Sequence, residues 1–313
     1  MKKFYFIILT SLLLLTCGCG FHADKPVEDL IVKYTDNHSR FIKLDGMNVH
    51  YRDVGEGPAV LLLHGSNASL HTWQGWADIL AADYRVISLD LPGHGLTGPH
   101  PKNQYKWQQV AQFINNFVDA ISLEKFTIVG NSMGGAIAWH YALQQPEKVS
   151  ALVLIDSRGI PPQESIPLIL RAYSMPVINN LLTVMTPKWT VGLNIKDVYG
   201  DPDKVSDEMI DRYFDLTLRA GNRDATVQRM THPNSYDSTE KLADLKLPTL
   251  IMWGEKDSWI LPKYASHFKQ YMPHAKMITY PELGHIPMEE APQQTAKDLK
   301  AFLQSPLTAS LQE

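Results

Sequence analysis

The feature that most constrains the fold is a run of β-forming residues that stops at a glycine and leads into a small-residue helix pattern. The run Thr127-Ile128-Val129 is followed by Gly130-Asn131-Ser132-Met133-Gly134. A serine placed between a strand and a helix in this way sits at a tight, strained turn that lifts its hydroxyl clear of the sheet. Side chains at 130 and 134 would collide across that turn, and glycine occupies both positions. The pattern predicts that Ser132 is a nucleophile.

The composition is that of an ordinary globular protein. The 313 residues suffice for one large α/β domain or two smaller ones, and 44% of them are hydrophobic, which supplies a core. A net charge of −4 without a basic stripe argues against a nucleic-acid partner. The 12 histidines are scattered and show no metal-ligand spacing, so neither a metal nor an organic cofactor is predicted. We expect a monomer by default.

Residues 1–18 are predicted to be a signal peptide. Lys2 and Lys3 precede the uncharged run of residues 4–16, which is too short to span a bilayer comfortably. Both cysteines, Cys17 and Cys19, follow directly, and the rest of the chain has none. A disulfide framework within the mature domain is therefore excluded.

The residues around the two cysteines resemble a bacterial lipobox, in which a small residue precedes the cysteine that is lipidated. Cys19 follows Gly18 and fits best, whereas Cys17 follows Thr16 and fits less well. Thr16 also stands where leucine is usual, so an ordinary signal peptide or an uncleaved anchor is the alternative. The resemblance implies an exported lipoprotein of the cell envelope, in the outer membrane of a Gram-negative cell; otherwise the protein is secreted or periplasmic. Residues 19–40 are mixed polar and are expected to be a tether.

Short apolar runs alternate with helix patterns along most of the remaining chain. Such runs are typical of strands buried on both faces of a parallel sheet, and the alternation predicts a mostly parallel, doubly wound α/β sheet covered by helices. The core is expected to comprise residues 41–158 and 237–313. The predicted strands are 47–54, 59–63, 84–89, 127–129, 149–155, 248–254 and 276–280, and the clearest helices are 104–121 and the closing one from Pro292.

The alternation breaks down over residues 159–236. Prolines cluster early in this segment, and a later stretch reads as an amphipathic helix with Ser206 as its N-cap. Ile210, Tyr213 and Phe214 would share one face of that helix. A segment of this size between two strand-rich halves predicts an inserted helical cap, or lid.

The carboxyl ends of the predicted strands supply the partners that a nucleophilic serine needs. Functional groups collect at these ends in parallel sheets. A serine hydroxyl requires a base, and His285, which follows a strand through Gly284, is the best candidate. Asp257 lies just after the preceding strand and would fix the histidine tautomer. Asp156, at the end of another strand, is the alternative acid.

The tetrahedral intermediate of such a reaction needs backbone N–H donors. The N–H of Met133 at the helix start and the N–H of Ser66 are the expected oxyanion hole, with Asn67 as the alternative to Ser66 and as a candidate substrate contact. His64 is expected to support its loop rather than to react. Arg158, near the mouth of the site, is either a ligand for a substrate carboxylate or a plain surface arginine.

These motifs follow one another in the order expected for the α/β-hydrolase superfamily. Residues 41–305 resemble this superfamily, in its capped, prolyl-iminopeptidase-like and lipase-like branch. The order Ser132, Asp257, His285 is the order of that family. The segments Gly-Asn-Ser-Met-Gly-Gly-Ala-Ile, Leu-Ile-Asp-Ser-Arg-Gly and Gly-His-Ile-Pro-Met-Glu-Glu-Ala are similar to bacterial lipases and esterases of the Moraxella/Psychrobacter type. The resemblance implies a serine carboxylesterase or lipase that cleaves a small-molecule acyl ester through an acyl-enzyme.

Departures from related families define the alternatives. Epoxide hydrolases and haloalkane dehalogenases carry aspartate in place of Ser132. Meta-cleavage C–C hydrolases share Gly-Asn-Ser-x-Gly-Gly but typically have tryptophan after the histidine, where Ile286 stands here. Hydrolysis of a C–C bond in a dienoate, or of an amide or peptide, is the alternative, and a non-catalytic binding protein is the least favoured because all three triad residues are present. An acidic substrate would need basic residues in the cap, and the cap segment contains five arginines: Arg171, Arg212, Arg219, Arg223 and Arg229.

Overall fold

A computed structural model describes residues 21–161, 175, 178–232 and 234–305 of the chain. The predicted signal peptide, Cys17, Cys19 and Arg171 lie outside the described residues, so lipidation and export stay predictions. Within the described ranges, no helix combines the length and the apolar character that crossing a bilayer requires.

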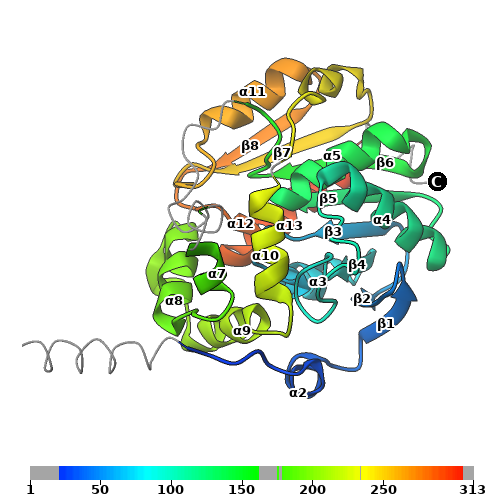
Figure 1. The fold of residues 1–313 in the computed structure, drawn as a ribbon. Helices are drawn as coiled ribbons and strands as arrows, with labels where there is room; N and C mark the ends of the chain where they lie inside the picture. Colours follow the sequence, from blue (N-terminus) through cyan, green and yellow to red (C-terminus); the bar gives the residue numbers. More distant parts are fainter. Residues whose placement is uncertain (1–20, 162–174, 176–177, 233, 306–313) are drawn as a thin grey trace, which may run out of the picture.

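The centre of the molecule is a single eight-stranded sheet with the order β1-β2-β4-β3-β5-β6-β7-β8 (Figure 1). The strands from β4 to β8 along this order are parallel to their neighbours, whereas β1 and β2 form an antiparallel edge. The predicted mostly parallel sheet is therefore confirmed. The strands are β1 (Ser39–Leu44), β2 (Met47–Val54), β3 (Ala59–Leu63), β4 (Arg85–Leu89), β5 (Phe126–Asn131), β6 (Val149–Ile155), β7 (Thr249–Gly254) and β8 (Lys276–Tyr280).

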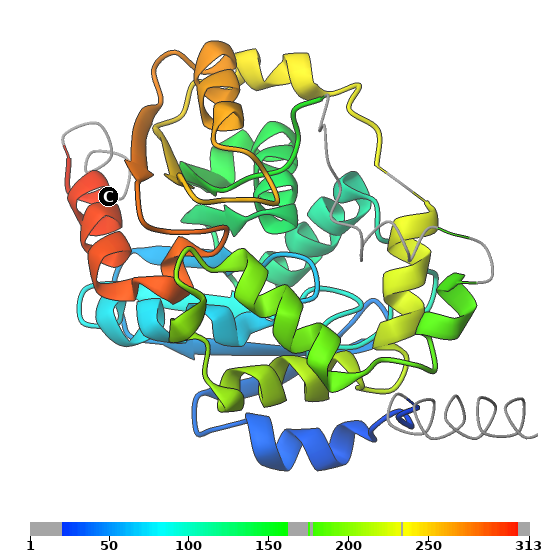
Figure 2. The ribbon, with the colours of Figure 1, turned by 90° about the vertical axis from the view of Figure 1, so that its left-hand side faces the viewer.

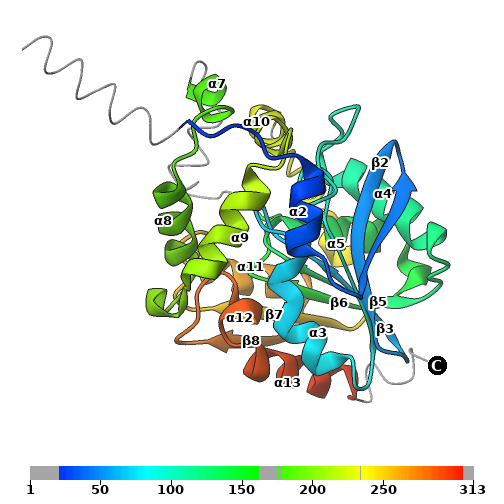
Figure 3. The ribbon, with the colours of Figure 1, turned by 90° about the horizontal axis from the view of Figure 1, so that it is seen from below.

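Helices cover both faces of the sheet, as Figures 1 and 3 show. One buried cluster joins the sheet to α4, α5 and α11, and a second joins its other face to α3 and α13. In α4 the buried Val110, Phe113 and Phe117 recur at helical spacing, which is why this segment lies with one face on the sheet. The core helices are α3 (Gln74–Leu80), α4 (Trp107–Ala120), α5 (Met133–Gln144), α11 (Lys263–Tyr271), α12 (Pro287–Glu290) and α13 (Pro292–Leu303), with 3-10 turns at Leu70–Trp73, Pro146–Lys148, Pro202–Lys204 and Thr239–Asp244.

Between β6 and β7 the chain forms a group of helices that lies beside the core (Figure 2). The Ser206 side chain accepts a hydrogen bond from the N–H of Met209 at 3.2 Å, so it caps its helix as the sequence predicts. The helices are α7 (Ile178–Leu182), α8 (Lys188–Val198), α9 (Asp207–Thr217) and α10 (Asn222–Thr231).

The expectation of a tether over residues 19–40 is wrong for residues 21–40. A helix, α2 (Val27–Tyr34), begins after Pro26 and buries Leu30 against Leu96 and Leu216. The N–H of Lys25 donates to the carbonyl of Leu218 at 2.7 Å. Sequence patterns offer little sign of this helix, because only its Leu30 side chain is fully buried and the residues that Leu30 contacts lie far away in the chain.

Asp215 of α9 holds this N-terminal arm, residues 21–34, against the cap. Its carboxylate accepts hydrogen bonds from the ammonium groups of Lys25 and Lys33 at 2.6 and 2.8 Å and from the hydroxyl of Tyr34 at 2.8 Å. Asp215 is 5% exposed, so these contacts satisfy a charge that would otherwise be buried alone. The arm therefore packs on the folded domain instead of leading away from it.

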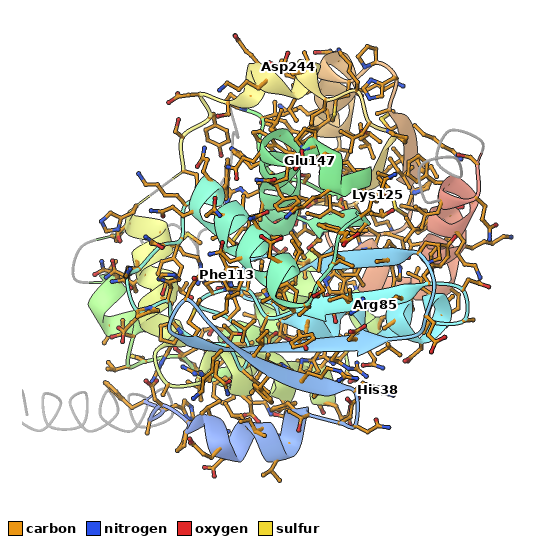
Figure 4. All side chains as sticks on the ribbon, turned by 90° about the vertical axis from the view of Figure 1, so that its right-hand side faces the viewer. His38, Arg85, Phe113, Lys125, Glu147 and Asp244 are labelled. Atoms are coloured by element: carbon orange, nitrogen blue, oxygen red, sulfur yellow. The ribbon has the colours of Figure 1, made fainter. Side chains whose placement is uncertain are left out.

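The first strand was also missed by the sequence analysis. β1 pairs with β2 in an antiparallel hairpin that turns at Asp45-Gly46, where both residues have positive φ. An Asp-Gly pair between two strand-like runs is a strong hairpin signal and could have revealed it. Figure 4 views this edge of the sheet, where the labelled Arg85 of β4 pairs with Asp53 of β2 at 2.7 Å.

Candidate active site

Ser132 sits at the turn between β5 and α5, in the conformation that its motif predicts. Its φ and ψ are 55° and −116°, a region that non-glycine residues rarely occupy. Its N–H donates to the carbonyl of Ile155 at 3.0 Å, which ties the turn to β6. A Cβ atom on Gly130 would lie 2.2 Å from the carbonyl oxygen of Gly134, so glycine at 130 is required for the turn to close.

Asp257 and His285 come from the loops that follow β7 and β8, and they meet next to this turn. His285 Nδ1 and Asp257 Oδ2 are 2.7 Å apart, and both side chains are buried. Asp257 Oδ1 also accepts from the N–H groups of Trp259 and Ile260 at 2.7 and 2.9 Å. Three donors therefore point at this carboxylate. Nδ1 is then the protonated ring nitrogen, and Nε2 is left as the base.

The backbone of His285 is fixed by residues that the sequence analysis did not identify. Its N–H donates to the carbonyl of Val198 in the cap at 2.7 Å. The side-chain amide of Asn131, next to Ser132, donates to the His285 carbonyl at 2.9 Å. The indole ring of Trp259 stacks on the imidazole at 5.8 Å between centroids. The cap is therefore part of the scaffold that positions the candidate base.

Asp156, the alternative acid, lies behind Asp257 and has a different environment. Its Oδ1 accepts from the N–H of Gly254 at 3.0 Å, and its Oδ2 is buried and has no partner among the described residues. Burial raises the pKa of Asp156 well above its usual value, and the nearby charge of Asp257 raises it further. The structure thus pairs His285 with Asp257, and burial favours the neutral form of Asp156.

Asp156, Asp257 and His285 are also the one cluster of potential metal ligands among the described residues, with one ligand atom of each within 4.8 Å of the others. The hydrogen bond between His285 Nδ1 and Asp257 Oδ2 already joins two of these side chains, and burial favours the neutral form of Asp156. This arrangement suits proton transfer better than metal binding.

The candidate oxyanion donors lie on either side of Ser132. Met133 is the first residue of α5, so its N–H has no acceptor within the helix. Ser66 is its neighbour, with Ser66 Oγ 3.4 Å from Met133 Sδ. Asn67 faces the cap, where its Oδ1 lies 3.5 Å from Thr226 Oγ1 and 3.5 Å from Arg229 Nη2. The roles of Ser66, Met133 and Asn67 stay predictions.

His64 supports the loop that carries Ser66. Its Nδ1 lies 2.7 Å from the carbonyl of Gly65, and its Nε2 lies 3.0 Å from the N–H of Leu91. Both ring nitrogens are thus used, with Nδ1 donating and Nε2 accepting. Complete burial lowers the pKa of His64, which keeps the ring neutral. These contacts fit the expected supporting role.

A pocket opens above Ser132 and is walled on its far side by the cap. It encloses about 1200 Å³, counting the space open to solvent, and Ser132 and His285 both lie in its lining. Arg158 also lines it, and the Arg158 N–H donates to the Ser132 carbonyl at 3.0 Å. The apolar wall consists of Leu182, Met185, Pro187, Val191, Ile195, Val198, Ile260 and Ile286.

Comparison with known proteins identifies the family. The profile of the alpha/beta hydrolase fold matches residues 58–292. The chain belongs to this family. That assignment agrees with the strand order, with the serine turn and with the meeting of Asp257 and His285 at the carboxyl ends of the strands.

Two curated relatives are dienoate hydrolases by name. The 2-hydroxy-6-oxo-6-phenylhexa-2,4-dienoate hydrolase of Burkholderia cepacia is 26% identical over 77% of this chain and 86% of its own length. The 2-hydroxy-6-oxo-6-(2'-aminophenyl)hexa-2,4-dienoic acid hydrolase of Metapseudomonas resinovorans is 29% identical over 84% and 90%. A solved membrane phospholipase A is 25% identical with a TM-score of 0.71, and the match covers 97% of this chain and 98% of that one. The finer resemblance to Moraxella/Psychrobacter lipases is not shown by these relatives.

Proposed function

We propose that this α/β hydrolase cleaves carboxylic esters with an apolar acyl group. Ser132 Oγ attacks the carbonyl carbon while His285 Nε2 takes its proton, and the N–H groups of Ser66 and Met133 bind the oxyanion. The C–O bond then breaks, and the alcohol leaves with the proton from His285. Water, deprotonated by the same histidine, hydrolyses the acyl-enzyme. Asp257 stabilises the imidazolium in both steps.

The observation that carries this proposal is the apolar pocket wall that converges on Ser132. The described cap arginines do not line this pocket. Their guanidinium groups form ion pairs and hydrogen bonds elsewhere in the fold. Arg212 pairs with Glu289 at 2.7 Å, and Arg223 pairs with Asp24 at 2.5 Å. Arg219 and Arg229 donate to backbone carbonyl groups. The cap thus offers acyl chains an apolar surface, and its basic residues are engaged elsewhere.

The extent of the match to the membrane phospholipase A also supports an ester substrate. That match covers nearly all of both chains, whereas the matches to the two dienoate hydrolases cover 77% and 84% of this chain. We therefore also propose that the N-terminal segment directs export and that Cys19 carries a lipid. A Cys19→Ser variant that loses no lipid mass and is retained in the membrane of the producing cell like the native protein would refute lipidation at Cys19.

C–C bond hydrolysis of a dienoate is the second candidate. The curated relatives support this reaction more directly than they support ester hydrolysis. A dienoate carries a carboxylate, and Arg158 is the one arginine or lysine in the described pocket lining. The same Ser132 and His285 would act on the ketone carbonyl of such a substrate.

One assay decides between the two reactions. The full chain is given p-nitrophenyl esters from acetate to palmitate and, in parallel, a 2-hydroxy-6-oxo-dienoate, with Ser132→Ala as the inactive variant. Ser66→Ala is the matched control, because it removes a hydroxyl at the site but keeps the backbone donor. Ester turnover that only Ser132→Ala abolishes supports the proposal. Turnover of the dienoate with kcat/KM at least about 100-fold above that of every ester overturns it in favour of C–C hydrolysis.

A further inference from the structure

The outer side of the cap carries apolar side chains that no part of the described chain covers. Nine large apolar side chains are exposed in the described residues, and seven of them belong to this region. The most exposed are Trp189 at 68% and Leu193 at 60%. Soluble proteins rarely gather exposed apolar groups in one place without a partner. We call this set the cap apolar surface: Phe21, Met175, Ile178, Leu181, Val184, Trp189 and Leu193.

Helices α7 and α8 are apolar on two sides. Ile178 and Leu181, three residues apart, share the outer face of α7, and Trp189 and Leu193, four apart, share that of α8. The inner side of the same two helices lines the pocket, for example through Leu182, Val191 and Ile195. A helix that is apolar on both sides normally has an apolar partner on both. Here the pocket and α9 cover the inner side, and no described residue covers the outer one.

The N-terminal arm enters the described structure at this surface. Phe21 pairs through its backbone with Met185, which follows α7, and Figure 2 shows the arm ending beside that helix. The residues that precede Phe21 in the sequence include the uncharged run 4–16 and Cys19. If an apolar or lipidated segment attached at this point enters a membrane, it brings the cap apolar surface close to that membrane.

Few charged side chains interrupt the surface. Residues 175–196 contain no aspartate or glutamate; of their two lysines, Lys188 pairs with Asp211 of α9, and Lys196 is followed directly by the exposed Asp197. Lys196 lies seven residues after Trp189, on the same face of α8, and is exposed. Tryptophan beside lysine is typical of surfaces that rest at the headgroup level of a bilayer.

From these observations we infer that the cap apolar surface rests on a phospholipid bilayer. Phe21, Ile178, Leu181, Trp189 and Leu193 enter the headgroup–acyl boundary, and Lys196 faces lipid phosphates. This contact holds the pocket wall formed by α7 and α8 against the membrane. The inference concerns binding and does not depend on which reaction the pocket performs.

Trp189 is a native reporter for this contact, because it is the one exposed tryptophan of the seven in the sequence. Trp73, Trp76, Trp107, Trp139 and Trp253 are buried, and Trp259 is half-buried in the pocket. The full chain is reconstituted in phosphatidylcholine–phosphatidylglycerol vesicles whose acyl chains carry bromine, which quenches nearby indoles. We expect a quenched component that is lost in Trp189→Phe and retained in the matched control Trp259→Phe.

A second pair of variants tests the surface itself. Ile178→Ser/Leu193→Ser should lower quenching of Trp189 at least about threefold, because it removes two apolar anchors. Val32→Ser/Met277→Ser removes exposed apolar side chains elsewhere, 86% and 39% exposed, and should leave quenching unchanged. Absence of a Trp189-specific component overturns the inference. So does a change from dimer to monomer in Ile178→Ser/Leu193→Ser without bromine quenching, because the surface then binds a second copy. Since no turnover is measured, failure here leaves the proposed reaction untouched.

Discussion

Replacing Glu290 by glutamine tests how the cap and the loop of the candidate base hold each other in place. Glu290 is 7% exposed, and its carboxylate accepts three backbone hydrogen bonds. Oε2 accepts from the N–H groups of Gly284 and Gly200 at 2.9 Å each, and Oε1 accepts from the N–H of Asp201 at 2.9 Å. Gly284 directly precedes His285, whereas Gly200 and Asp201 belong to the cap. One carboxylate therefore joins the two segments.

Glutamine keeps the shape of this side chain but has only one acceptor oxygen. Whichever way its amide turns, the NH₂ group faces at least one buried backbone N–H. The variant loses at least one hydrogen bond to a charged group, worth about 1.5–3 kcal/mol, and leaves a donor unpaired. We expect Glu290→Gln to lower the free energy of unfolding by about 2–4 kcal/mol. We also expect kcat to fall about tenfold or more, because His285 shifts with Gly284.

Urea unfolding, followed by tryptophan fluorescence, measures the first quantity, and hydrolysis of a soluble ester measures the second. Glu282→Gln is the matched control. Glu282 lies in the same loop, but its side chain is 80% exposed and pairs with Lys256 at the surface. Its loss should cost less than about 1 kcal/mol and leave kcat unchanged. Equal effects of the two substitutions, or a Glu290→Gln protein with native stability and kcat, would refute the reasoning.

Three further predictions concern buried titratable groups. Asp257→Asn should lower kcat about 10³-fold or more, whereas Asp156→Asn should stay within about threefold of the native rate, since burial favours the neutral form of that carboxyl. Steady-state kinetics measures both rates, and the reverse order of effects would assign the acid role to Asp156. Burial lowers the pKa of His140 from 6.5 to about 4, and its ring accepts a hydrogen bond from Gln108. Between pH 6.5 and pH 4, His140 is therefore protonated in the unfolded chain but neutral in the folded one. The free energy of unfolding should fall by up to about 3 kcal/mol as the pH drops through this range. His140→Gln should narrow the difference in urea midpoint between pH 7 and pH 4.5, and an unchanged difference would contradict this. Asp215→Ala should release the N-terminal arm, so that limited proteolysis cleaves the arm faster than in the native protein. An unchanged rate of cleavage would contradict this prediction.

Much of the fold could be predicted because its signals are local. The buried strands are short apolar runs, and the turn at Ser132 needs small residues at fixed spacing. Ser206 caps its helix for an equally local reason. The helix α2 was missed because Asp215, which anchors its end, lies far away in the sequence and shows no pattern that points to Lys33.

The sequence by itself determined the fold class, the strained serine, and the residues Asp257 and His285 as its candidate partners, because strand periodicity and turn sterics are properties of neighbouring residues. Only the tertiary structure decided which carboxylate contacts His285, since Asp156 and Asp257 end adjacent strands and differ only in burial and donors. It alone revealed that Val198 and Glu290 lock the cap to the histidine loop. Hydrogen bonds and desolvation depend on groups that meet in space from distant parts of the chain, and no spacing along the sequence encodes them.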